Sequence, residues 1–272
     1  MRAPRLLVVL AAAALLAPLG ATTAVAAPPD NDTPAGATVV ASVPDTVMQS
    51  TAEATTDAVD ARLNQQCGAP ATNGSVWFTY TDTTGNGLLV DVTGSSFSAG
   101  AMIVEGDPAA GGFVVACGPG VAAVRGGAGT TYSVMAFSDT VGVTGGNLVA
   151  RFQDLGPAPV STLTVDPRAT AFKAGSMRLT GTYSCSNANG FSSDVEGSVV
   201  QRVGRTKISG FFFASPLECD GAVHPWEAVA FSDNGLFAGG KAANVSVVFA
   251  CGDFDCGTSF VEQTVQVSRN GK

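Results

Sequence analysis

Hydrophobic and polar positions alternate along most of this chain, and the stretch 75–106 shows the pattern most clearly. In residues 76–81 and again in 88–93, successive side chains switch character with a period of two. This period is typical of β-strands with one buried face. A third strand is predicted in the remainder of this stretch, before Gly106. The stretch Asp82–Gly87 is rich in glycine and asparagine, so it predicts a hairpin turn between the first two strands.

Further short runs of the same kind fill the rest of the chain. We predict a strand pair in residues 36–50, one helical turn in residues 57–66, and about eight strands in all before residue 155. Strands this short, bounded by Gly, Asn or Asp, favour a β-sandwich of jelly-roll type for residues 28–155. Residues 156–160 form a proline-rich, semi-rigid linker. Seven more strands in residues 161–272 favour an immunoglobulin-like sandwich, so the predicted fold is all-β with two tandem sandwiches.

The first 27 residues have the features of a secretory signal peptide. Arg2 and Arg5 precede an apolar run from Leu6 to Leu19, and small residues stand before Pro28. The run is shorter than the about 20 residues that span a bilayer, which disfavours the alternative of a membrane anchor. We expect cleavage after Ala26 or Ala27 and a secreted, extracellular mature protein that is not associated with the membrane.

Charge is distributed unevenly. The formal net charge is −8, and residues 28–157 hold only three basic side chains, Arg62, Arg125 and Arg151. An acidic surface repels phosphates, so nucleic acid is excluded as the expected partner.

Six cysteines in an exported chain predict three disulfides. Only Cys67 and Cys117 lie in the first predicted domain, and the five-residue spacing of Cys251 and Cys256 suits a hairpin, which leaves Cys185 to pair with Cys219. The alternative is a zinc site built from Cys251, Cys256 and His224. It lacks a second closely spaced ligand pair.

Candidate catalytic and metal-binding residues are few. His224 is the one histidine, and no G-x-S-x-G motif or phosphate-binding loop occurs. Asp253 and Asp255 could act as a glycosidase carboxylate pair, but the predicted small sandwich offers them no evident cleft. We therefore predict a protein that is not an enzyme and has no cofactor. The three oxygen-bearing residues Asp30, Asn31 and Asp32 leave calcium binding open.

Recognition of a partner is the remaining class of function, and aromatic residues are its candidates. Three consecutive aromatics, Phe211–Phe213, must place at least one ring on each face of a strand. We take Phe212 as a tentative partner contact, with a core position as the alternative, and Phe254 at the tip of the predicted disulfide hairpin as a second.

Two resemblances extend this interpretation. Residues 30–153, through NDTPAGATVV, SVWFTYT, GLLVDVTGSSFSAGAMIVEG, VACG, GAGTTYSVMAF and GGNLVARF, resemble the pre-peptidase C-terminal domain. That resemblance implies a β-sandwich appended to secreted bacterial proteins. The chain departs from the family at residues 98–101, where members often carry an acidic residue and a threonine.

The second half, through LTGTYSC, VEGSVVQRVGRTKISGFFF, EC and ACGDFDC, resembles uncharacterised Ig-like domains of exported proteins from high-GC Gram-positive bacteria. Its Cys251–Cys256 hairpin is also similar to one in the enediyne-carrying apoproteins.

The function we expect is that of a secreted binding or adhesion protein that recognises an extracellular protein or polysaccharide. The alternatives are a carrier of a small apolar ligand and an accessory or inhibitor partner of a secreted enzyme. A deep apolar cleft would favour the carrier, and a flat aromatic patch would favour the binding protein.

Overall fold

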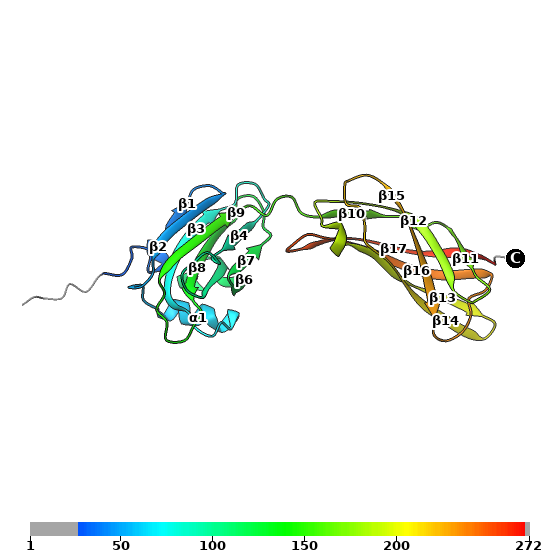
Figure 1. The fold of residues 1–272 in the computed structure, drawn as a ribbon, viewed down its shortest axis with the longest axis horizontal. Helices are drawn as coiled ribbons and strands as arrows, with labels where there is room; N and C mark the ends of the chain where they lie inside the picture. The colour runs from blue at the N-terminus through cyan, green and yellow to red at the C-terminus, as the bar shows by residue number, and fades with distance from the viewer. Residues whose placement is uncertain (1–26, 270–272) are drawn as a thin grey trace, which may run out of the picture.

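The computed structural model describes residues 27–269. Except for Ala27, the predicted signal peptide lies outside these residues. Figure 1 shows two groups of strands connected by one short segment. The predicted all-β class is confirmed, since strands dominate both groups. No helix of the described residues is long and apolar enough to cross a membrane.

The first half contains nine strands in two sheets, of orders β1-β3-β8-β5-β6 and β2-β9-β4-β7. A core that includes the edge-to-face pair Phe78 and Phe152 fills the space between the sheets. The elements are η1 (Pro34–Gly36), β1 (Thr38–Val40), β2 (Asp45–Ser50), α1 (Ala58–Cys67), β3 (Asn73–Thr81), β4 (Leu88–Asp91), β5 (Ala99–Glu105), η2 (Pro108–Ala110), β6 (Phe113–Pro119), β7 (Val121–Val124), β8 (Thr131–Ser138) and β9 (Asn147–Gln153).

Two details of this half differ from the prediction. The strands β3 and β4 do not form a hairpin, because β3 pairs with β1 and β8 in one sheet and β4 pairs with β7 and β9 in the other. The Asp82 carboxylate instead organises the crossing between the sheets, by accepting the N–H groups of Thr84, Gly85 and Gly87. Burial opposes ionisation of Asp82, but these hydrogen bonds prevail and hold its pKa below the usual value.

The second difference concerns burial of β3, which is covered on both faces rather than one. Residues 58–67 form a full helix, α1, capped by Asp57, instead of a single turn. Leu63 of α1 belongs to a second core with Trp77, Met102 and Phe137 on the side of the sheet away from β4. On β3, Val76, Phe78 and Tyr80 therefore face the core between the sheets, while Trp77 is buried on the opposite face.

The second half is built from one long run of hydrogen-bonded strands, β10-β12-β11-β17-β16-β13-β14-β15. Its elements are β10 (Val160–Leu163), β11 (Arg168–Ala171), β12 (Met177–Ser186), η3 (Gly190–Ser192), β13 (Asp194–Val203), β14 (Thr206–Ala214), β15 (His224–Ser232), β16 (Gly240–Cys251) and β17 (Cys256–Arg269).

Pairing of β12 with β15 closes these strands into a ring, whereas an immunoglobulin-like sandwich would have two separate sheets. The closure has a local cause. Strand β11 leaves its neighbour β12 after two residue pairs and runs parallel to β17. A second short junction joins β14 to β15. Two layers result, with β10, β12 and β15 opposite β11, β17, β16, β13 and β14.

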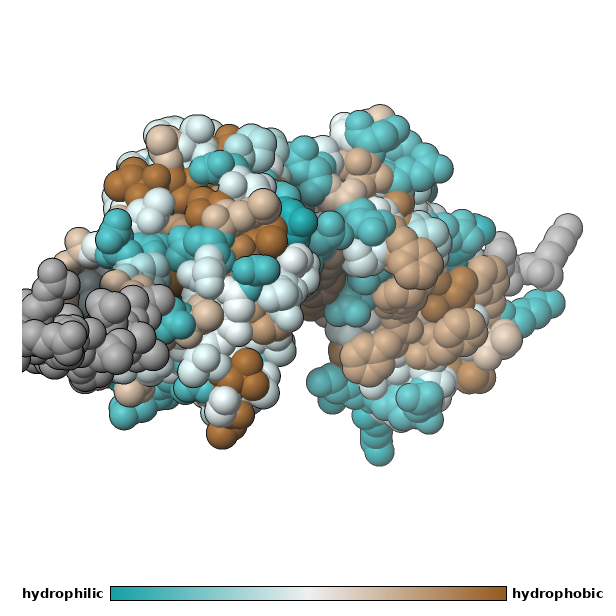
Figure 2. All heavy atoms as spheres, turned by 60° about the vertical axis from the view of Figure 1, so that its left-hand side comes forward, coloured by the Kyte–Doolittle hydropathy of each residue, from teal (hydrophilic) through white to brown (hydrophobic). Residues whose placement is uncertain are grey.

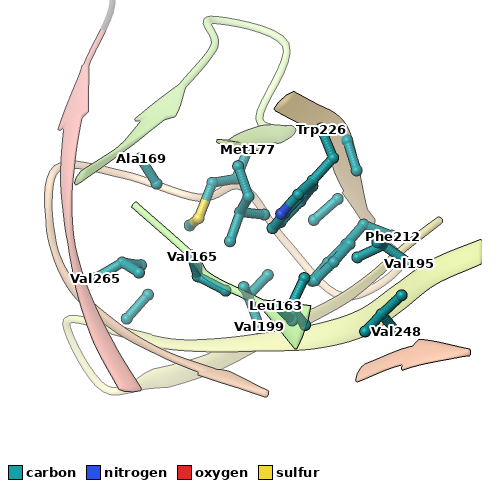
Figure 3. Close-up of a cluster of buried hydrophobic side chains, with 14 of the residues drawn as sticks. Leu163, Val165, Ala169, Met177, Val195, Val199, Phe212, Trp226, Val248 and Val265 are labelled. Carbon is teal, nitrogen blue, oxygen red and sulfur yellow. The ribbon is translucent and has the colours of Figure 1, made fainter. Parts of the chain in front are cut away.

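The core of this half lies inside the ring (Figure 3). The Phe212 ring stacks on Trp226 with centroids 5.9 Å apart, and the Trp226 indole N–H donates to the Thr164 carbonyl at 2.9 Å. Alternate residues of β12 from Met177 to Cys185 share the buried face.

All three disulfides have the predicted partners: Cys67–Cys117, Cys185–Cys219 and Cys251–Cys256. The first ties the end of α1 to β6, and the third joins β16 to β17 at their turn. Three disulfides suggest folding in an oxidising, extracellular environment.

Candidate functional site

Phe212, one of the two predicted partner contacts, is a core residue, so this prediction is wrong. Only 4% of it is exposed, because β14 directs every second side chain into the ring and Phe212 shares that direction with Ile208. Its neighbours point the other way, and Phe211 and Phe213 are 72% and 60% exposed. The three consecutive aromatics do place rings on both faces of β14. The buried face carries one ring, that of Phe212, and the exposed face carries the other two.

Glycine at position 197 makes this arrangement possible. Gly197 on β13 lies directly opposite Phe212, and a Cβ atom there would collide with the Phe212 ring and with the Val245 carbonyl. The absence of a side chain lets Phe212 reach Trp226, which fixes the register that turns Phe211 and Phe213 outward.

The exposed rings of β14 belong to a larger apolar surface. Phe231 of β15 and Phe260 of β17 are 69% and 62% exposed, and two valines of β16 point the same way. In Figure 2, hydrophobic side chains gather on the surface of the half that carries the C-terminus. We call this surface the aromatic face, and its apolar residues are Phe211, Phe213, Val229, Phe231, Val245, Val247 and Phe260.

Strand register arranges the aromatic face in two rows that run across the strands. In the first row, each residue lies opposite the next one on the neighbouring strand. From β15 to β17, the row contains Phe231, Phe211, Ser198, Val245 and Glu262. Five strands at about 4.8 Å spacing make this row about 19 Å wide.

The second row contains Phe213, Glu196, Val247 and Phe260. Because small Ser198 and flexible Glu196 on β13 stand between bulky neighbours, the surface is hollowed there. The depression has a volume of about 610 Å³ and is open to solvent.

Among the described residues that line this depression, Glu196 is the one charged side chain. Glu196 is exposed at the middle of the second row, and Asp194 lies two residues before it on the same side of β13. One oxygen of Asp194, Oδ1, is buried and has no hydrogen-bond partner. Burial, together with the nearby Glu196 charge, raises the pKa of Asp194.

Phe254, the second predicted partner contact, is 52% exposed next to the Cys251–Cys256 disulfide. It does not belong to the aromatic face. It lines a separate, mainly polar depression of about 650 Å³ together with Asp253, Asp255 and Arg125. Its role as a partner contact stays a prediction.

The Asp253–Asp255 loop is tied to the first half through its second carboxylate. Arg125 Nε donates to Asp255 Oδ2 at 2.5 Å, and Arg125 Nη2 donates to Asp255 Oδ1 at 3.3 Å. Asp255 is thus engaged in an ion pair, so the two aspartates do not form a free carboxylate pair.

His224 is held by two acidic side chains at the start of β15. Its Nε2 atom lies 2.8 Å from Asp220 Oδ1 and its Nδ1 atom 3.4 Å from Glu218 Oε2, while the ring packs against Tyr183. The Asp220 hydrogen bond and charge raise the pKa of His224. Because both ring nitrogens face carboxylates, His224 has a structural role in this loop.

Side chains of the Asp30–Asp32 segment serve the fold. Asn31 is buried and donates to the Trp77 carbonyl at 3.0 Å, and Asp32 accepts the Thr55 N–H and hydroxyl, both at 2.6 Å. In the part of the chain that the structure describes, no three His, Cys, Asp or Glu side chains are grouped as metal ligands.

No direct signal in the sequence pointed to Phe231, Phe260 or Glu196. They come from three different strands and meet only through the register of β13 to β17. The exposure of Phe211 and Phe213 could have been predicted as an alternative. In a strand, three consecutive aromatics bury either the middle ring or the two outer rings.

Comparison with known proteins adds one family match. Residues 159–253 match the model described as "Family of unknown function (DUF6299)". This segment contains β10 to β16, and so most of the aromatic face, but less than half of the chain. The resemblance of residues 30–153 to the pre-peptidase C-terminal domain stays a prediction. No curated protein matches the sequence.

Solved structures with some likeness include large glycosidases. One is an FMN-binding beta-glucuronidase from Facaelibacterium prausnitzii L2-6, at 14% identity and a TM-score of 0.23, covering 71% of this chain and 32% of the enzyme. Another is a GH2 beta-galacturonidase from Eisenbergiella tayi, at 11% identity and a TM-score of 0.22, covering 71% and 35%. The chain thus spans about a third of these enzymes, and likeness this weak carries no argument about activity.

Proposed function

We propose that this protein is a secreted, non-enzymatic binding protein and that the aromatic face is its binding surface for another extracellular protein. The observation that carries the proposal is the presence of four phenylalanines, each 60–72% exposed, on one continuous outer surface of β14, β15 and β17. Contiguous exposed apolar surface of this kind marks interaction sites in proteins that are otherwise polar outside.

The strands beneath the face form a firm support. β16 and β17 pair along their whole length, from Gly240 opposite Val267 to the disulfide pair Cys251 and Cys256. A rigid layer holds the phenylalanine rings in fixed positions, which lowers the entropy lost when a partner binds.

Among the possible partners, a protein fits this face better than a polysaccharide. Sugar recognition needs many hydrogen-bonding groups, and the lining offers few polar side chains, chiefly Ser198 and Glu196. A carrier of a small apolar ligand would need an enclosed cavity, because pockets bury most of their ligand's surface. The depression is open instead, which favours a protein partner.

The immunoglobulin-like expectation for the second half belongs to the same proposal. Support comes from the two opposed layers, β10, β12 and β15 against β11, β17, β16, β13 and β14, which are joined at short junctions. The aromatic face covers the outside of the larger layer and the adjoining part of β15.

A capture experiment with matched variants tests the proposal. The mature protein, a Phe211→Ser/Phe231→Ser variant and a Phe191→Ser control are each immobilised and exposed to culture supernatant and to cell-wall polysaccharide. Phe191 is 86% exposed but lies on η3 and does not line the depression.

We expect one or more proteins to be retained by the wild type and the control and lost by the double variant, followed by direct binding of the purified partner. Equal capture by all three proteins, or retention of polysaccharide alone, would contradict the proposal.

A further inference from the structure

The aromatic face carries negative charge within its apolar surface, and this charge has no partner inside the protein. Glu196 stands directly between Phe213 and Val247 in the second row. Within residues 27–269, neither Glu196, Asp194 nor Glu262 forms a salt bridge.

One basic side chain, Arg178 of β12, lies opposite Val229 at the edge of the aromatic face, where it forms an ion pair with Glu227. The basic side chains of β13 and β14 lie farther along their strands. Lys207, the basic residue of β14, precedes Phe213 by six residues, which is about 20 Å along an extended strand. Arg202 is opposite Lys207 on β13, at the same distant end. The face therefore has an acidic region around Glu196 and Asp194 that its own cations do not neutralise.

Covering Glu196 has an energetic consequence for any partner. A wholly apolar partner would remove the carboxylate from water without replacing its hydrogen bonds, which disfavours binding. A partner with a guanidinium or ammonium group at that position would restore the hydrogen bonds in charge-assisted form. The same cation would lie beside the Phe213 ring, where cation–π attraction adds to the binding.

We infer that the aromatic face selects a partner segment in which an arginine or lysine stands between apolar side chains, with the cation bound by Glu196 and flanked by Phe213. The apolar side chains of the segment occupy the depression between Phe211 and Val245. This inference rests on the proposed binding surface. It assigns to Glu196 the discrimination between apolar segments that carry a cation and those that do not.

Asp194 strengthens the inference through its unsatisfied oxygen. Its Oδ1 atom is buried without a hydrogen-bond partner, two residues from Glu196 on the same side of β13. A bound cation beside Glu196 offsets the repulsion that the Glu196 charge exerts on Asp194 and so favours the ionised form of Asp194.

The test compares two short peptides on the mature protein. Ac-Phe-Leu-Arg-Phe-NH₂ carries the cation, and the same peptide with citrulline in place of arginine is neutral and nearly equal in shape. Binding is followed by amide NMR shifts of residues 196–198, 211–213 and 245–247. Glu196→Gln is the test variant, and Glu53→Gln, an exposed glutamate of the first half, is the control.

We expect the arginine peptide to bind wild type and Glu53→Gln about 10-fold more tightly than the citrulline peptide, which corresponds to about 1.4 kcal/mol. In Glu196→Gln the two peptides should bind equally. Equal binding of both peptides to wild type at these residues would contradict the role of Glu196 but would still support the aromatic face as a binding surface. Failure of both peptides to shift these residues would overturn the inference together with the surface.

Discussion

At the scale of single residues, Asp60 gives the sharpest prediction of pH dependence. It is fully buried at the first turn of α1, where its Oδ2 atom accepts the Ser75 hydroxyl at 2.6 Å and the Asp57 N–H at 2.9 Å. Burial outweighs these hydrogen bonds and raises its pKa to about 6. Since the unfolded value is near 4, folding takes up a proton between these pH values, and the contribution of Asp60 to stability falls as pH rises through 6.

We therefore expect the first half to lose about 1–2 kcal/mol of unfolding free energy between pH 4.5 and pH 7 through this one group. Asp60→Asn should remove that loss. The measurement is thermal unfolding by circular dichroism at both pH values, for wild type and variant. An unchanged pH dependence in Asp60→Asn would show that Asp60 is already ionised at pH 4.5.

The aromatic residues show how far a local pattern predicts a site. Strand alternation requires rings on both sides of β14, and the structure has them. Which ring is buried depends on Gly197 and Trp226, which lie on β13 and β15 and reach Phe212 only in the folded ring. The local sequence of β14 contains no information about these neighbouring strands. The prediction therefore identified the aromatic segment correctly but took the buried Phe212 as the partner contact.

At the scale of elements, the three disulfides have unequal effects on stability. Cys185–Cys219 closes a loop with a sequence separation of 34, and Cys251–Cys256 one of 5. Chain-entropy estimates give about 3–4 kcal/mol for the longer loop and about 2 kcal/mol for the shorter. Cys185→Ala/Cys219→Ala should therefore lower the melting temperature of the second half more than Cys251→Ala/Cys256→Ala does. Calorimetry checks this order, and the reverse order would contradict it.

Strands were easier to predict than the sheets that contain them. The segments around β3, β4 and β5 show the period of two in the local sequence. The crossing from one sheet to the other depends on Asp82, which accepts hydrogen bonds from three backbone N–H groups. Glycine-rich turns within a sheet and crossings between sheets look alike in sequence. The cysteine pairs could be predicted because the linker leaves only two cysteines in the first half.

At the scale of the whole molecule, Arg125 connects the two halves. Besides its ion pair with Asp255, its Nη1 atom donates to the Asn86 carbonyl at 3.0 Å and to the Gly156 carbonyl. One guanidinium thus holds a loop of the first half, the connecting segment and the Cys251–Cys256 loop.

Arg125→Ala should leave the melting temperatures of both halves nearly unchanged and increase their motion relative to one another. Small-angle scattering would show a broader distribution of distances. Arg151→Ala, which removes an ion pair with Asp91 inside the first half, is the control and should not broaden it. Identical scattering for wild type and Arg125→Ala would contradict the proposed connection.

The central claim is that the whole molecule presents one binding surface, the aromatic face. The most direct measurement is the dissociation constant of the captured protein partner for wild type, Phe211→Ser/Phe231→Ser, Phe191→Ser and Phe254→Ser, with folding checked by melting temperature. Central aromatic residues of an interface contribute about 2 kcal/mol or more each, so the double variant should weaken binding by at least about 100-fold. Phe191→Ser and Phe254→Ser should stay within about twofold of wild type. Unchanged affinity in the double variant, or a loss confined to Phe254→Ser, would contradict the claim.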